Sequence, residues 1–204
     1  MPTRKYEQGL RAEAAEETRR RILDALYARL SEQPSEPVSV DQIARLARVA
    51  RSTIYLIFGS RAGLFDELAA ELFRTGEFAQ VEAAAAEPDA REHLRGAARG
   101  ATAMLAAHRD VFRVLYSMAQ LDPNSVGGAV HRLEEARARG MARIAQRLGD
   151  EGLLRDGVTV ADATNLIWLL GSFDAFDLLY SGRGLSVDEI VVLFVETAER
   201  ALYA

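Results

Sequence analysis

The sequence predicts an all-α protein of about nine helices. Ala, Leu, Arg and Glu, which favour helices, dominate most segments. β-Branched residues are sparse and apolar and polar residues never alternate over a long run, so strand signals are missing. Loops rich in Gly, Pro, Asp and Asn separate segments of helical length. With 204 residues and 49% hydrophobic content, the chain can bury the cores of two small domains.

The first predicted helix spans roughly residues 16–32. Its apolar residues share one face at helical spacing, and they are Ile22, Leu23, Leu26, Tyr27 and Leu30. The loop between Pro34 and Pro37 ends this helix. The charged segment before it, residues 1–15, is predicted to form a flexible N-terminal arm. We expect a plain solvated tail, with contacts to a phosphate backbone as the alternative.

Two short helices separated by a tight turn are predicted between residues 39 and 58. Ser39 can cap the first, in which Val40, Ile43, Ala44 and Ala47 recur at the spacing of a buried face. The second runs from about residue 50 to 58 and buries Ile54 and Phe58, four residues apart. Both helices are too short to be stable without packing against neighbours, and the first predicted helix should supply that packing.

The second short helix presents polar groups and an aromatic ring outward. Such groups offer donors and a flat apolar edge, which suit contact with phosphates and base edges in a major groove. Beyond it, Ser60 can cap the next helix, and Arg61 falls in that helix's first turn, where donors attract a phosphate. The residues predicted to contact DNA are Ser39, Arg48, Arg51, Ser52, Thr53, Tyr55, Leu56 and Arg61.

The same stretch resembles the TetR family of transcriptional regulators. The family pattern reads Thr-Val-x-x-Ile-Ala, then Ala-Gly-Val-Ser, then Thr-Leu-Tyr-x-x-Phe and Ser-Lys-x-x-Leu. Residues in register with it are Ser39, Val40, Ile43, Ala44, Ala47, Val49, Thr53, Ile54, Tyr55, Phe58, Ser60, Arg61 and Leu64. The resemblance implies a helix-turn-helix DNA-binding domain at residues 16–65 and a helical effector-binding and dimerisation domain at residues 66–204.

Three residues depart from the family pattern. Arg48 stands where Gly is usual, so the turn could force a residue with a Cβ to a positive φ. Ala50 stands where Ser or Thr usually caps the second short helix, which contacts DNA in the family, and Ala offers no side-chain oxygen. Ile57 replaces a residue that is often aromatic or His. These changes put the strength and sequence preference of DNA binding in question.

The remaining predicted helices span roughly residues 60–87, with Gly76 as a dividing point, then 90–107, 109–119, 125–148, 160–180 and 187–202.

The helices predicted over residues 160–180 and 187–202 are apolar on more than one face, so they need partners on more than one side. We expect them to pair with the same helices of a second copy in a four-helix homodimer interface, with Gly171 and Ala175 permitting close approach. The interface candidates are Leu166, Leu170, Phe173, Leu178, Val187, Ile190, Val191, Phe194 and Val195.

The resemblance also implies a small effector, bound among the C-terminal helices, that favours a conformation misfitting a palindromic operator. Two reading helices must lie about one DNA turn, about 34–36 Å, or a multiple apart to enter successive grooves. The candidate pocket residues favour an apolar or aromatic effector, and they are Met104, Leu105, His108, Phe112, Leu115, Tyr116, Met118, Leu133, Asp162, Asn165, Trp168 and Ser172. The resemblance makes repression the default mode.

Charge is distributed unevenly along the chain. Residues 1–65 carry 11 Lys and Arg against 8 Asp and Glu, a net charge of +3, and residues 66–204 carry 14 against 22, a net charge of −8. The basic end is therefore the end predicted to bind DNA, because a short basic face is enough to contact phosphates. The acidic remainder fits a domain that faces away from the duplex.

Other protein classes remain as alternatives or find little support. The chain has no Cys, its three His are scattered and no glycine-rich phosphate loop follows a strand, so an enzyme is not expected. No cofactor and no metal site is predicted, although a metal-responsive regulator using Asp162, His108 or His131 stays open. A helical adaptor with weakened DNA binding also stays open, because of Arg48 and Ala50. Without a long apolar run or a signal peptide, we expect a cytoplasmic protein that does not enter a membrane.

Overall fold

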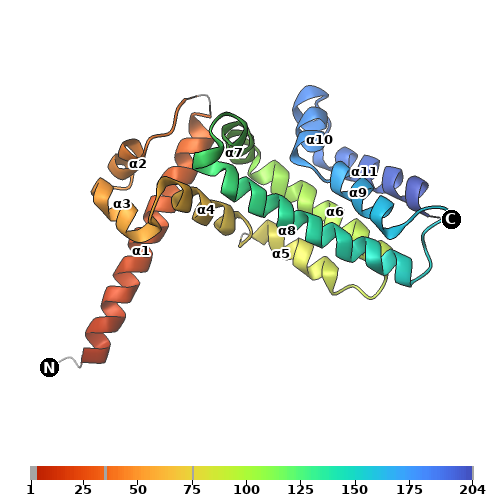
Figure 1. Cartoon of the computed structure of the whole chain (residues 1–204), viewed down its shortest axis with the longest axis horizontal. Helices are drawn as coiled ribbons and strands as arrows, with labels where there is room; N and C mark the ends of the chain where they lie inside the picture. Colours follow the sequence, from red (N-terminus) through yellow and green to blue (C-terminus); the bar gives the residue numbers. More distant parts are fainter. Residues whose placement is uncertain (1–3, 35, 75, 204) are drawn as a thin grey trace. The chain divides into compact units, whose positions relative to one another are not determined.

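The structure is a computed structural model that describes residues 4–34, 36–74 and 76–203 (Figure 1). All its named elements are helices, which confirms the predicted fold class. They are α1 (Arg4–Glu32), α2 (Val40–Leu46), α3 (Arg51–Phe58), α4 (Arg61–Leu72), α5 (Gly76–Ala85), α6 (Ala90–Ala107), α7 (Arg109–Leu121), α8 (Pro123–Asp150), α9 (Val160–Leu170), α10 (Phe173–Asp177), the π-helical turn η1 (Leu178–Gly182) and α11 (Val187–Leu202).

The helix boundaries differ from the prediction in two places and agree with it at a third. Helix α1 begins at Arg4 instead of near residue 16. The predicted helix over residues 60–87 is divided into α4 and α5, and α5 begins at Gly76, the predicted dividing point. The predicted continuous helix over residues 160–180 is wrong, because the chain breaks at Gly171 and the Ser172 hydroxyl caps a new helix by accepting from the Ala175 N–H at 3.1 Å.

Two compact units make up the chain. The N-terminal unit comprises residues 1–70 and 113–130, and the C-terminal unit comprises residues 71–112 and 131–204. The first boundary lies close to the predicted one at residue 65. Residues 113–130, which include most of α7 and the start of α8, cluster with the N-terminal unit, and nothing in their sequence signals this.

The core of the N-terminal unit forms where α1 packs against α2 and α2 against α3 (Figure 1). Ile22 and Leu26 of α1, Ile43 of α2 and Ile54 of α3 are all fully buried. These are the residues whose helical spacing predicts an inward face. Together they remove enough apolar surface from water to hold two helices that would be unstable alone.

The Arg29 side chain forms hydrogen bonds with the loop that follows α1. It is only 3% exposed and donates to the backbone carbonyls of Gln33 at 2.5 Å and Pro37 at 3.2 Å. It also forms an ion pair with Glu36 at 3.2 Å. These contacts give partners to both terminal nitrogens of Arg29 and so fix the path of the chain into α2, whereas its Nε is buried with no hydrogen-bond partner in the described residues.

The core of the C-terminal unit lies between α6, α8, α9 and α11. Helix α6 packs against α5 and α11, and α9 packs against α11. Its fully buried side chains include Leu94 of α6, Leu148 of α8 and Ile167 of α9. Thr159 and Ser186 begin α9 and α11 with reciprocal hydrogen bonds to Asp162 and Glu189, so both helix starts are fixed by capping boxes.

His93 and Arg147 form a buried polar contact in this unit. The guanidinium Nη1 of Arg147 lies 3.1 Å from Nδ1 of His93, and Nη2 donates to the carbonyls of Glu87 at 2.6 Å and Pro88 at 2.8 Å. Since a guanidinium only donates, Nδ1 of His93 must be the unprotonated acceptor. Burial first, and then the charges of Arg147 and Arg143, lower the pKa of His93, so the ring stays neutral.

No helix in the described part of the chain is both long and apolar enough to span a lipid bilayer.

Candidate nucleic-acid interface and apolar cavity

Helix α2 and the turn after it form a rigid platform. The Ser39 hydroxyl accepts a hydrogen bond from the Gln42 N–H at 3.2 Å, which confirms its predicted role as a cap. The turn closes when the Val49 N–H donates to the Ala44 carbonyl at 2.9 Å. Within it Arg48 has φ of +53°, so the predicted positive angle is confirmed at a residue that carries a Cβ.

Helix α3 begins without a side-chain cap. Ala50 has the extended backbone of a cap residue, yet no side chain accepts from the first turn. Ile54 and Phe58 face inward as predicted, with Ile54 fully buried. The helix is therefore held by packing on one side and presents its other side to solvent.

The exposed side of α3 carries most of the residues predicted to contact DNA. Leu56 is 85% exposed, and Arg51 and Ser52 are also exposed. Thr53 and Tyr55 are half-buried, whereas Ser39 and Arg48 lie exposed before the helix. The N-terminal unit therefore leaves this surface uncovered.

Arg51 is the centre of a small polar cluster on that surface. Its Nη1 lies 2.8 Å from Oδ2 of Asp41, and its Nη2 donates to the Tyr55 hydroxyl at 3.3 Å. The guanidinium carbon also lies 5.5 Å from the centre of the Tyr55 ring, within the range of a cation–π contact. The hydrogen bond to Tyr55 and the pairing with Asp41 raise the pKa of Arg51. Sequence spacing did not identify Asp41, because only the turn brings α2 and α3 together.

Arg61 is held within the N-terminal unit. Its Nη1 lies 3.0 Å from Oδ2 of Asp122, and its Nη2 donates to the Val38 carbonyl at 3.2 Å. The guanidinium also lies over the ring of Phe65 at 5.5 Å. Its predicted contact with a DNA phosphate stays a prediction.

Comparison with known families identifies this arrangement. Residues 22–68 match the model of the bacterial regulatory proteins of the tetR family, and this range contains α2, the turn and α3. This part of the chain is therefore similar to the tetR family of bacterial regulatory proteins. The match ends near the boundary of the first segment of the N-terminal unit, at residue 70.

The TetR-like fold extends over nearly the whole chain. A protein from Rhodococcus sp. assigned to the TetR-family transcriptional regulators superimposes with a TM-score of 0.74 at 14% identity, covering 92% of this chain and 99% of that one. NalD of Pseudomonas aeruginosa, described as the secondary repressor of the MexAB-OprM multidrug efflux pump, has a TM-score of 0.72 at 24% identity, covering 93% and 98%. The fatty acid degradation regulator FadR of Bacillus halodurans has a TM-score of 0.72 at 15% identity, covering 89% and 94%. Among curated proteins nothing matches.

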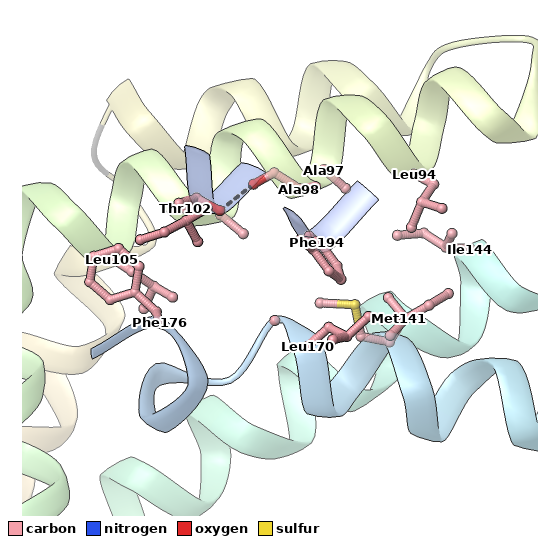
Figure 2. A pocket seen from close by; sticks show the side chains of 14 residues that line it. Leu94, Ala97, Ala98, Thr102, Leu105, Met141, Ile144, Leu170, Phe176 and Phe194 are labelled. Carbon is pink, nitrogen blue, oxygen red and sulfur yellow. Dashed lines mark hydrogen bonds between the residues drawn. The ribbon is translucent and has the colours of Figure 1, made fainter. Parts of the chain in front are cut away.

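The C-terminal unit of this TetR-like fold contains a narrow apolar cavity between α6, α8, α9, α10 and α11 (Figure 2). About 20 Å³ of it is open to the centre of a water-sized sphere, which is room for about one water molecule. Its lining residues are Leu94, Ala97, Ala98, Ala101, Thr102, Leu105, Met141, Ile144, Ile167, Leu170, Gly171, Phe176, Ile190 and Phe194.

Polar chemistry is scarce around this cavity. Thr102 supplies the lone side-chain hydroxyl of the lining, and it donates to the Ala98 carbonyl of its own helix at 2.8 Å (Figure 2). At Gly171 an added Cβ would lie 3.3 Å from the Met141 methyl, so this glycine permits close approach within the protomer. The described lining therefore favours apolar contacts over directional hydrogen bonds.

Of the twelve predicted pocket residues, only Leu105 lines this cavity. Asp162 and Ser172 use their oxygens to cap α9 and α10, and the hydrogen bonds from Thr159 lower the pKa of Asp162. The other nine lie elsewhere, and their contact with an effector stays a prediction: Met104, His108, Phe112, Leu115, Tyr116, Met118, Leu133, Asn165 and Trp168. The cavity is also lined mostly by bulky apolar side chains, together with three alanines of α6, but these come from positions that helical spacing did not single out.

Trp168 lies on the surface of α9. It is 38% exposed, Arg137 stacks over its ring at 4.6 Å, and Nη1 of Arg137 donates to its carbonyl at 2.5 Å. Its fluorescence therefore reports on this surface and not directly on the cavity.

The predicted interface residues divide into three groups by exposure. Phe173, Ile190 and Phe194 are at most 7% exposed and belong to the core of the protomer, whereas Leu178 is 70% exposed. Leu166, Leu170, Val187, Val191 and Val195 are half-buried. Exposed apolar side chains that the prediction omitted lie on the same C-terminal elements, and they are Trp168, Leu169, Tyr180, Val192 and Leu193.

The candidate metal ligands lie in separate settings. His131 Nε2 is 3.2 Å from Oε1 of Glu135 one turn along α8, and His108 is the residue that ends α6. Within the described residues, no three His, Cys, Asp or Glu side chains gather closely enough to hold a metal ion.

Proposed function

We propose that this protein is a transcriptional repressor that binds a palindromic operator as a homodimer and is released by a small apolar ligand. The observation that carries the proposal is the uncovered side of α3, where Arg51, Ser52 and Leu56 project from a platform fixed by Ser39 and buried Ile54. Cationic, hydroxyl and apolar groups on one short helix suit phosphate and base-edge contact together. No catalytic role is proposed.

The homodimer is supported by the exposed apolar side chains of the C-terminal elements. Leu169 is 59% exposed, and Val192 and Leu193 are 54% and 45% exposed. A second copy would remove these groups from water, and a two-fold axis would present two reading helices to successive major grooves. The charge asymmetry agrees, since the basic end would face the duplex.

The effector is supported by the apolar cavity. Because it holds about one water molecule, an organic ligand must displace lining side chains such as Met141 and Phe176. Met has flexible torsions that allow such movement. A ligand that binds only the widened cavity stabilises that conformation, and this differential affinity is what coupling to DNA release requires.

Repression is supported by analogy with NalD, which is described as a repressor, at 24% identity. The neighbours differ in the processes their descriptions name, an efflux pump and fatty acid degradation. They therefore select no particular effector for this chain.

The test begins with selection of a preferred sequence from a random duplex library, followed by electrophoretic shifts at several salt concentrations. We expect a palindromic site, a specific excess over random DNA and affinity that falls steeply as salt rises. Arg51→Ala should relax the preference for particular base pairs. Tyr55→Phe should weaken binding to all sequences alike if the Tyr55 hydroxyl holds a phosphate. Failure to bind any duplex at low salt would support the helical adaptor instead.

Light scattering tests the dimer. The wild type should have twice the monomer mass at micromolar concentration, and Leu193→Arg should shift it towards monomer because it places a charge in an apolar interface. Arg200→Ala, which alters an exposed ion pair with Glu196 on the same helix, is the matched control and should stay dimeric. A monomeric wild type would contradict this part of the proposal.

A further inference from the structure

Asp41 is an unusual residue for a surface that binds a polyanion. Its side chain is 52% exposed and pairs with Arg51, which is 56% exposed. An exposed ion pair of this kind adds little to folding stability. A carboxylate beside the reading helix also repels phosphates, so it weakens the sequence-independent part of DNA affinity. Asp41 also lies in the first turn of α2, where a carboxylate favours the helix N-terminus, but that interaction does not require a contact with Arg51.

The geometry of the contact suggests a different role. Asp41 accepts from Nη1 of Arg51 at 2.8 Å, and the Tyr55 hydroxyl accepts from Nη2 at 3.3 Å. Each Nη nitrogen carries two hydrogens, so each keeps one free after these bonds. Two donors held in one plane match the O6 and N7 acceptors of guanine in the major groove.

We infer that Asp41 is a specificity-determining positioning residue, which holds Arg51 for two-point recognition of a guanine in the operator. The inference rests on the proposed DNA-binding function. Arg51 touches the base, and Asp41 acts through it. A long side chain that is already ordered loses less conformational entropy when it binds, so its correct partner gains affinity relative to other bases.

The experiment compares Asp41→Ala with Arg51→Ala in the full chain by selection from a random duplex library. Asp41→Ala should relax the preference for guanine at the same base pair as Arg51→Ala. The ratio of operator affinity to random-duplex affinity should fall about 3- to 10-fold, the cost of ordering one long side chain. In the Arg51→Ala background, Asp41→Ala should cause no further loss of preference, because the two residues act as one unit.

Asp24→Ala is the matched control. Asp24 is an exposed carboxylate of α1 in the same unit, so its removal changes the net charge equally but should leave base preference intact. Asp41→Asn is the second variant, for use if Asp41→Ala does not fold. It is nearly isosteric and removes the charge, and it should relax the preference at the same base pair to a smaller degree.

Two results would overturn the inference. If Asp41→Ala changes affinity for every sequence by one factor, the carboxylate contributes charge alone. If it relaxes a base pair that Arg51→Ala leaves intact, Asp41 does not act through Arg51. A wild-type protein that selects no sequence at all contradicts the proposed function itself, and the two failures are therefore distinguishable.

Discussion

Arg61 and Asp122 form an ion pair, with Nη1 and Oδ2 3.0 Å apart, although 61 residues separate them in the chain. Arg61 begins α4, and Asp122 lies between α7 and α8. Nη2 of Arg61 also donates to the Val38 carbonyl, just before α2. One guanidinium thus joins three segments of the N-terminal unit, including one that lies beyond the TetR-family match.

Arg61→Ala should lower the free energy of unfolding by about 1–2 kcal/mol, because it removes a charged hydrogen bond to a backbone carbonyl as well as the ion pair. Asp122→Ala should cost less than about 1 kcal/mol, since this carboxylate is 48% exposed. Urea unfolding of both variants and of the double variant measures these values. We expect the double variant to lose less than the sum, and strict additivity would contradict a direct contact.

The same variants separate this structural role of Arg61 from a contact with phosphate. If Arg61 also holds a phosphate, Arg61→Ala should reduce the slope of log affinity against log salt by about one. Asp122→Ala should leave that slope unchanged, because it removes no cation. Equal slopes in all three proteins would leave Arg61 with the structural role alone.

Arg48→Gly should stabilise the protein by about 0.5–1 kcal/mol. At φ of +53° the Cβ of Arg48 crowds the backbone, and Gly removes that strain. The greater entropy of Gly in the unfolded chain offsets part of this gain. Chemical denaturation measures the gain. Arg48→Ala removes the same charge but keeps the Cβ, so it should show no gain, and equal stability of the two variants would contradict the strain.

Ala50→Ser should add about 1 kcal/mol to stability by giving α3 the hydroxyl cap that it lacks. The Ala50 backbone is already extended, with φ of −70° and ψ of +147°, so a serine there needs no rearrangement. Thermal unfolding is the measurement, with Ala50→Val as a control that cannot accept a hydrogen bond. A serine variant no more stable than the wild type would mean that the first turn is satisfied in another way.

Stability should fall as the pH drops through the range in which a free histidine takes up a proton. Burial lowers the pKa of His93 below the ordinary value of 6.5, so below that pH the unfolded chain binds a proton that the folded chain does not. The free energy of unfolding therefore decreases as pH falls, until the folded pKa is reached. Denaturant unfolding between about pH 8 and 5 should reveal this slope.

His93→Asn supplies the comparison for the pH effect. Asn does not titrate, and its amide oxygen can still accept from Arg147. Its stability should depend less on pH than that of the wild type over the same range. Identical pH dependence in both proteins would show that His93 takes up its proton equally well when folded.

Local spacing was sufficient to predict α2, α3 and the turn between them. Ser39, Ile43, Ile54 and Phe58 lie within a stretch of twenty residues, and cap and periodicity signals act over single turns of helix. The positive φ at Arg48 followed from the same local pattern. The contacts of Arg51 with Asp41 and of Arg61 with Asp122 could not be predicted, because each depends on how separate helices pack.

The C-terminal unit was harder to predict for a related reason. An apolar residue on a two-faced helix can face the protomer core, a cavity or a partner, and helical spacing is the same in each case. Packing placed Ile190 and Phe194 beside the cavity and left Leu193 exposed. The Met141 methyl that borders Gly171 comes from another helix, so local spacing could not predict this contact.

By itself, the sequence determined the helical class, the two short helices with their inward faces, and the resemblance of residues 22–68 to the tetR family. These features depend on propensities and periodicities that act between near neighbours in the chain. Tertiary structure decided which residues assist Arg51 and Arg61, that residues 113–130 join the N-terminal unit, and which side chains border the cavity. The physical reason is that burial is a property of the packed assembly of helices, and no single helix specifies which of its neighbours will cover it.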